Sequence, residues 1–200
     1  MRIAVRFGLI LLVLGVMFVY LGLKERSVSA QASHAPEKIS LARLLARETD
    51  GNPNVILTNF VPCDDYVYEQ DNTRWTGAWV PVIPDEGVEP GRGHAEAPKQ
   101  VQALIFSINA HNEMELYNRC TRPELPALVV NKIVSLKSDQ KKLLQEKYPG
   151  TDFEKCLIIQ EGREPAGDTK LLVMIGGGGL AALAGVCLTG FFVFGLITKR

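Results

Sequence analysis

The stretch Leu171 to Ile197 contains no charged residue, and a second uncharged run, Phe7 to Leu23, lies near the other end of the chain. An α-helix rises 1.5 Å per residue, so about 20 apolar residues cross a hydrocarbon core of roughly 30 Å. Both runs therefore predict membrane-spanning helices. Every acidic residue lies between the two runs, so this middle segment is the part of the chain that can fold outside the membrane.

The polar segment between the two runs, residues 24–170, is long enough for one domain with a core of its own. It contains all 22 acidic residues but only 18 of the 22 Lys and Arg residues, which leaves a net charge of −4. A nucleic-acid surface would show clustered basic residues instead. The composition therefore predicts no nucleic-acid partner.

We expect four parts along the chain: a membrane anchor at 1–23, a polar tether at 24–38, an α+β domain at 39–165, and a membrane helix with a short basic tail at 166–200. Cleavage as a signal peptide is the alternative for residues 1–32, because Ala30-Gln31-Ala32 is typical of a cleavage site. The first apolar run, with 17 residues, is longer than the apolar core of most signal peptides, which is about 7–15 residues, and this favours an anchor. Both versions send the middle segment across the membrane.

Positive charge is denser in the two short tails than in the loop residues beside the helices. The tails contain Arg2, Arg6, Lys199 and Arg200. Basic residues near membrane helices favour the cytoplasmic side, and a long loop translocates largely regardless of its charge. We therefore expect an integral membrane protein with two helices, both termini in the cytoplasm and the middle domain extracytoplasmic.

Small residues recur in both apolar runs. Gly8, Gly15 and Gly22 are spaced every seven residues. The second run has a row with a spacing of four, which consists of Gly177, Ala181 and Gly185. Such rows let helix backbones approach closely, so one interpretation is that the two helices pack together, bind other membrane proteins or self-associate. The other is that glycine is simply common in membrane helices.

The middle segment alternates between helical and strand patterns. We expect helices at 41–47, 111–120 and 139–148, with Ser40 and Ser138 as N-caps. Strand patterns occur at 54–61, 66–70, 74–80, 101–109, 127–136 and 155–161, and 85–98 is a loop rich in Gly, Pro and Glu. An early hairpin followed by interspersed helices predicts an α+β fold: a mixed sheet of about five strands with two or three helices.

The early hairpin is rich in aromatic residues. In a regular strand Trp75 and Trp79 share one face, as do Tyr66 and Tyr68. Packing of aromatic side chains across the strands explains these four residues, and a ligand platform or a membrane-interface contact is the alternative.

Few residues offer chemistry. Cys63-Asp64-Asp65 supplies a thiol and two carboxylates, but neighbouring strand residues point to opposite faces and do not converge on one metal ion. His111 has no second histidine at the spacing of a zinc site. We therefore assign no catalytic, cofactor-binding or metal-binding residue, and expect no cofactor. An enzyme that uses Cys63, Asp64, Asp65 or His111 is the alternative.

Cysteine usage leaves the redox state open. Cys63, Cys120 and Cys156 lie in the middle segment and Cys187 lies in the second apolar run. An odd number allows one disulfide with a free thiol, in three pairings, or three buried thiols. A bond between Cys120 and Cys156 is one of these arrangements.

Three stretches carry a resemblance to a known family. They are Asp50 to Val55, Trp79 to Pro84, and Tyr148 to Pro165 ahead of the polyglycine helix. The chain resembles a family of uncharacterised two-helix bacterial membrane proteins of planctomycete type, which implies no activity. Its topology is also similar to that of Surf-type oxidase assembly factors, whose characteristic sequence pattern is missing here.

With two anchors and no catalytic signature, the sequence predicts a membrane-anchored, non-enzymatic module for interaction or assembly in a bacterial envelope. The alternative is a membrane-surface enzyme that uses residues of the extracytoplasmic domain.

Overall fold

The computed structural model describes residues 2–47, 51–72, 74–85, 100–108, 110–131 and 133–197. The chain divides into two compact units. One unit combines both chain ends, Met1–Ala30 and Ala166–Arg200, and the other comprises Gln31–Pro165. Most of the expected loop at 85–98 lies outside the described residues.

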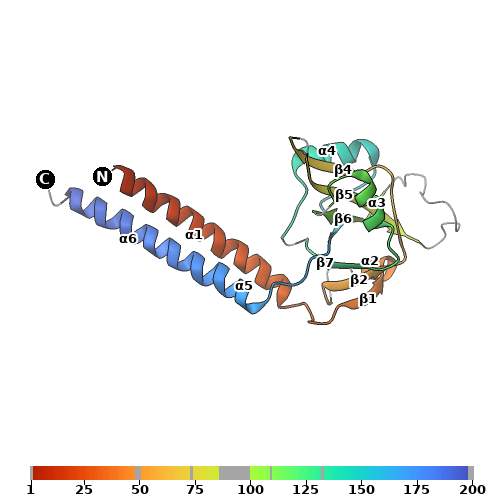
Figure 1. Ribbon diagram of the computed structural model, residues 1–200, viewed down its shortest axis with the longest axis horizontal. Coiled ribbons are helices and arrows are strands. Elements are labelled where there is room, and N and C mark those ends of the chain that lie inside the picture. The colour runs from red at the N-terminus through yellow and green to blue at the C-terminus, as the bar shows by residue number, and fades with distance from the viewer. Residues whose placement is uncertain are drawn as a thin grey trace. The chain divides into compact units, whose positions relative to one another are not determined.

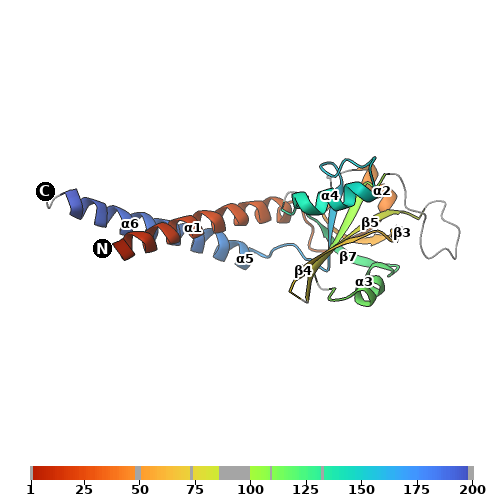
Figure 2. The same ribbon diagram turned by 90° about the horizontal axis from the view of Figure 1, so that it is seen from above.

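The first unit is a helical hairpin. Its first arm is α1 (Arg2–Ser29), and its second arm consists of α5 (Asp168–Leu172), the π-helix η1 (Val173–Gly177) and α6 (Gly178–Ile197). The two arms lie side by side, and the start of α1 and the end of α6 lie at the same end (Figures 1 and 2). By length and composition, both arms are long and apolar enough to cross a membrane.

Glycine lets the two arms touch backbone to backbone. A Cβ added at Gly15 would lie 2.4 Å from the backbone N of Ala182, and one added at Gly185 would lie 2.6 Å from the carbonyl O of Gly8. A Cβ added at Gly177 meets no described atom within 4 Å beyond its own helix. Gly185 of the expected row therefore lies in the contact, but Gly177 does not.

The second unit is an α+β domain around one mixed sheet, as expected, but with more strands. The strands are β1 (Glu37–Ser40), β2 (Asn54–Thr58), β3 (Phe60–Pro62), β4 (Val67–Asp71), β5 (Arg74–Pro84), β6 (Ala103–Ser107), β7 (Leu125–Val129) and β8 (Leu157–Glu161). The eight-stranded sheet has the order β1-β2-β7-β8-β6-β5-β3, and β4 also pairs with β5. Pairs β1–β2 and β6–β8 are parallel and the others are antiparallel, which makes a strongly curved, nearly barrel-shaped sheet (Figure 1).

Two features correct the expected count of about five strands. Asn59 adopts a positive φ of 52°, so the single strand expected at 54–61 becomes β2 and β3. In addition, β1 begins within the expected tether at 24–38, and α1 also extends into that segment as far as Ser29. Both ends of the tether therefore belong to regular elements, and residues 30–36 connect them.

Three helices belong to this domain: α2 (Leu41–Ala46), α3 (Glu113–Cys120) and α4 (Ser138–Lys147). Ser40 caps α2 as expected, because its Oγ accepts a hydrogen bond from the backbone N of Arg43. The expected cap at Ser138 is wrong by one residue. Lys137 is the N-cap of α4, and its backbone N donates to Gln140 Oε1 at 2.9 Å.

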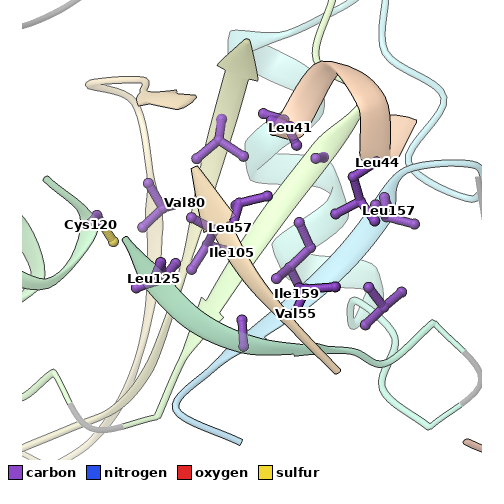
Figure 3. Close-up of a cluster of buried hydrophobic side chains, with 14 of the residues drawn as sticks. Leu41, Leu44, Val55, Leu57, Val80, Ile105, Cys120, Leu125, Leu157 and Ile159 are labelled. Carbon is purple, nitrogen blue, oxygen red and sulfur yellow. The ribbon is translucent and has the colours of Figure 1, made fainter. Parts of the chain in front are cut away.

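The concave side of the sheet holds the main core (Figure 3). Alternate residues of the strands point into it, including Val55 and Leu57 of β2 and Ile105 of β6. Leu41 and Leu44 of α2 join them, and burial of each such leucine stabilises the fold by about 1.5–3 kcal/mol. From α3 come Leu116 and Cys120, so this helix is fixed to the sheet by one face only.

A second layer lies on the other side of the sheet. Trp79 of β5 stacks on Phe106 of β6 with ring centroids 4.4 Å apart. Leu144 of α4 and Tyr148 at its C-cap are fully buried, and the Tyr148 hydroxyl donates to the carbonyl O of Asp65 at 3.0 Å. This bond fixes the chain segment that leads from β3 into β4.

Candidate functional site

A cavity of about 700 Å³ lies between α3 and the segment that joins β3 to β4. We call it the α3 cavity. Its lining residues are Pro62, Cys63, Asp64, Tyr66, Val80, Glu113, Met114, Leu116, Tyr117 and Cys120. A cavity of this size and mixed lining is within the range of ligand-binding sites.

A β-bulge sets the aromatic residues beside this cavity. The pairing of β4 with β5 shifts between Glu69 and Gln70, so that Gln70 pairs with Trp75 but Glu69 pairs with Gly77. One extra residue in β5 reverses the alternation of its side chains. The expectation that Trp75 and Trp79 share a face is therefore wrong.

Each tryptophan has its own set of partners. Trp75 stacks on Tyr68 with centroids 4.4 Å apart and contacts Tyr66 at 6.1 Å, so these two tyrosines do share a face. Trp79 stacks instead on Phe106, and its indole N donates to Glu69 at 3.2 Å. Aromatic packing across the strands is therefore confirmed for Trp75 with Tyr66 and Tyr68, whereas Trp79 packs on a residue outside the expected four. Trp79 is buried, but Tyr68 remains 47% exposed.

Exposed apolar side chains lie in and beside the cavity. Met114 is 74% exposed, Tyr117 is 48% exposed and Tyr68 is 47% exposed. Met114 and Tyr117 line the cavity together with Tyr66, and Tyr66 contacts Trp75, on which Tyr68 stacks. We call these five residues the aromatic rim. Contiguous exposed apolar surface of this kind is typical of a binding site, whereas single exposed apolar side chains are common on any protein surface.

Two carboxylates, those of Asp64 and Glu113, complete the lining, and no Lys or Arg is among the described residues that form it. Burial, together with the interaction of its hydroxyl with Glu113, raises the pKa of Tyr66 to about 12. Tyr66 is therefore protonated at neutral pH and is a hydrogen-bond donor toward Glu113. The cavity thus combines apolar walls with negative charge.

The two cysteines of the lining are poor nucleophiles. Burial raises the pKa of Cys63 to about 11 and that of Cys120 to about 12. Only a thiolate is a strong nucleophile or metal ligand, so neither thiol is activated at neutral pH. Both are free, as are Cys156 and Cys187, and Cys156 Sγ lies 3.4 Å from the carbonyl O of Val101.

The four residues of the enzyme alternative do not converge. Cys63 and Asp64 line the α3 cavity, but Asp65 forms an ion pair with Lys147 at 3.1 Å. His111 is exposed, and its backbone N donates to Glu115. Among the described residues, no group of three or more His, Cys, Asp and Glu could hold a metal ion.

Glu161 positions the C-terminal end of α3. This buried carboxylate, 4% exposed, accepts hydrogen bonds from Ser107 Oγ and from Arg119 Nη1, the latter at 3.0 Å. Because Arg119 precedes Cys120 on α3, the pair ties the helix to the ends of β6 and β8. The wall of the cavity is therefore held by a charged anchor as well as by apolar packing.

The sequence did not single out Met114 and Tyr117, although a signal was present. Leu116 and Cys120 are four residues apart and face the core, and Met114 and Tyr117, three apart, lie on the neighbouring face of α3 and are exposed. An eight-residue helix whose apolar residues extend beyond the core-facing stripe predicts a further contact surface.

A second cavity of about 600 Å³ lies at the starts of β6 and β8 and includes Gln100, Thr151 and Cys156 in its lining. Its charged residues form ion pairs: Lys155 with Asp152 at 3.3 Å, and Glu154 with Lys141. This cavity lacks a contiguous exposed apolar border among the described residues, so the α3 cavity is the stronger candidate.

Comparisons of the chain with protein-family models, with curated proteins and with solved structures found no match. The resemblance to a planctomycete-type membrane protein family therefore stays a prediction. Function is inferred below from the residues of this chain alone.

Proposed function

We propose that this chain is a membrane-anchored, non-enzymatic binding protein, whose α+β domain binds or helps to assemble other proteins of a bacterial envelope. The aromatic rim around the α3 cavity is the observation that carries this proposal. Outside the hairpin, five described large apolar side chains are exposed, and three of them belong to the rim.

The hairpin supports the anchoring part of the proposal. Lipid offers no hydrophobic drive for helices to associate, so close packing of small residues supplies the contact instead. The backbone contacts of Gly15 with Ala182 and of Gly185 with Gly8 are of this kind. A packed pair of helices is a firmer anchor than one helix, and it leaves other small residues, such as Gly177, for contact with further membrane proteins.

We place both termini in the cytoplasm and the domain outside it, because of the basic residues in the two tails. A domain in that position meets other envelope proteins. The enzyme alternative lacks comparable support, since the thiols of Cys63 and Cys120 have raised pKa values and Asp65 forms an ion pair with Lys147.

Photocrosslinking in cells tests the proposal. A photoreactive amino acid is placed at Met114, in the rim, and in a control chain at Leu143, which is 51% exposed on α4 but does not line the α3 cavity. We expect a covalent adduct with another protein from position 114 and none from position 143. Equal adducts from both positions, or none from position 114, would contradict the proposal.

A further inference from the structure

One wall of the α3 cavity is held firmly in place. It is the segment that joins β3 to β4, and the backbone N of Cys63 in this segment donates to the carbonyl O of Pro81 at 2.8 Å. The carbonyl O of Asp65 accepts from the Tyr148 hydroxyl at 3.0 Å, and Tyr66 packs against the main core. This wall is therefore fixed to the sheet and to the layer behind it.

The opposite wall is α3, whose C-terminal half is anchored more strongly than its first turn. Leu116 and Cys120 pack in the core, and Arg119 forms an ion pair with the buried carboxylate of Glu161 at 3.0 Å. By contrast, residues 111–114, at the start of the helix, are all exposed. A segment with little buried apolar surface opens at a lower free energy than the core does.

The first turn of α3 keeps its helical form through bonds of its own. Asn112 Oδ1 accepts from the backbone N of Glu115 at 2.9 Å, and Glu115 Oε2 accepts from the backbone N of His111 at 3.0 Å. Such caps satisfy backbone donors that a helix start leaves without partners. Because these bonds join residues of the turn to one another, the turn keeps them when it moves away from the sheet.

A hydrogen bond connects this turn with the fixed wall. The Tyr66 hydroxyl donates to the carboxylate of Glu113, the first residue of α3. Both residues line the α3 cavity, so the bond joins the two walls. A hydrogen bond to a charged acceptor is stronger than one between neutral groups. This bond therefore stabilises the closed position of the turn and contributes nothing once the walls separate.

We infer that the first turn of α3 is a flap over the α3 cavity, and that the bond between Tyr66 and Glu113 holds this flap closed. The inference rests on the proposed function and names how access to the same site is controlled. A partner that fits the widened cavity better than the closed one shifts the population toward the open position.

The thiol of Cys63 reports the position of the flap. Cys63 lies on the fixed wall, lines the α3 cavity and is 3% exposed. Cys156 is 2% exposed and does not line this cavity, so it is the internal control. The full chain in a mild detergent is treated with iodoacetamide, and mass spectrometry follows the labelling of each cysteine over time. Opening of the flap speeds the labelling of Cys63 alone, whereas unfolding of the domain speeds both.

Matched variants test the bond. Tyr66→Phe keeps the ring and removes only the hydroxyl, and we expect Cys63 to react about tenfold faster than in the native chain. Tyr68→Phe is its control, because Tyr68 lies on β4 and does not line the cavity. Glu113→Gln keeps a weaker, uncharged acceptor, so the increase should be smaller, about threefold. Its control is Glu115→Gln, on the same helix but outside the lining.

The outcomes separate the inference from the proposed function. Faster labelling of Cys63 in Tyr66→Phe and Glu113→Gln, but not in their controls, supports the inference. An unchanged rate in Tyr66→Phe, or an equal increase at Cys156, overturns it. If the rate at Cys63 is unchanged while position 114 still crosslinks to a protein in cells, the inference is wrong and the proposed function stands. If Cys63 responds but position 114 gives no adduct, the flap exists and the proposed function is wrong.

Discussion

At the scale of single residues, two carboxylates connect elements of the domain: Glu161 is buried and Glu69 is half-buried. Glu161 and Glu69 each accept hydrogen bonds from side chains of other elements: Glu161 connects β8 with α3, and Glu69 connects β4 with α4 and β5. A buried charge with several donors stabilises one arrangement of its neighbours, because its loss leaves those donors without partners. Substitution of either residue should therefore change the stability of the domain.

Replacement of Glu161 by Gln should destabilise the protein. The change removes the charge that faces Arg119 and Ser107, and we expect a loss of about 1–3 kcal/mol in the free energy of unfolding. The control is Glu124→Gln, whose ion pair with Lys38 is exposed, with an expected change of about 0.5 kcal/mol or less. Thermal unfolding of the full chain in detergent measures both. Equal effects would mean that the buried pair is not an anchor.

Glu69 should make stability depend on pH. Burial disfavours its charged form, but hydrogen bonds from Lys137, Gln140 and Trp79 outweigh burial and hold the pKa of Glu69 below its usual 4.5. Since the pKa is lower in the folded state, the stabilisation is fully present above the unfolded value and is lost as the pH falls through the folded value.

Comparison with Glu69→Gln measures this effect. The difference in unfolding free energy between the two proteins should be constant near neutral pH and shrink below pH 4.5. Trp79 fluorescence is a local readout, because its indole donates to Glu69. A difference that does not change with pH would show that the Glu69 charge contributes nothing.

At the scale of elements, the sequence predicted what depends on local pattern. The nearly continuous apolar run at 101–109 predicted a central strand, and β6 indeed pairs on both sides, with β5 and with β8. The run at 54–61 also has the composition of a strand, but Asn59, which has a positive φ, divides it into β2 and β3. Asn adopts this conformation more readily than most residues, yet no periodicity reveals where it does so.

Elements that depend on distant partners could not be predicted in this way. The strand β1 has one buried apolar residue, Ile39, and exists because it pairs with β2. The α3 cavity needs residues from β3, the segment between β3 and β4, β5 and α3 together. The sequence drew attention to Cys63, Asp64, Tyr66 and Cys120 of its lining, but not as parts of one site. The bulge opposite Glu69 and Gln70 changes which aromatic residues are exposed, and its position is likewise a property of the pairing.

The two helical arms make a prediction of their own. Gly15→Leu or Gly185→Leu should force the arms apart, because a side chain there meets backbone atoms of the other arm. Spin labels at Leu9 and Leu188, both exposed on the hairpin, should show a distance longer by roughly 2 Å or more. Gly177→Leu is the control and should leave the distance unchanged. A larger effect from Gly177→Leu than from Gly15→Leu or Gly185→Leu would contradict this contact between the arms.

At the scale of the whole molecule, the positions of the cysteines decide how the membrane topology can be measured by thiol labelling. The thiols of Cys63, Cys120 and Cys156 are buried, and Cys187 lies in a candidate membrane span. The native cysteines should therefore not react with a polar thiol reagent while the protein is folded. An added cysteine at an exposed polar site outside the hairpin gives a clear signal instead.

Lys142 is such a site, since it is exposed on α4. With Lys142→Cys in intact cells, we expect labelling by a membrane-impermeant maleimide without any disruption of the membrane. The native chain should take up the reagent only after unfolding, which is the control. The physical reason is that the basic tails favour the cytoplasm, whereas a long middle segment crosses largely regardless of its charge. If Lys142→Cys reacted only after the membrane was broken, the domain would face the cytoplasm. The partner proposed for the α3 cavity would then have to be sought among cytoplasmic proteins.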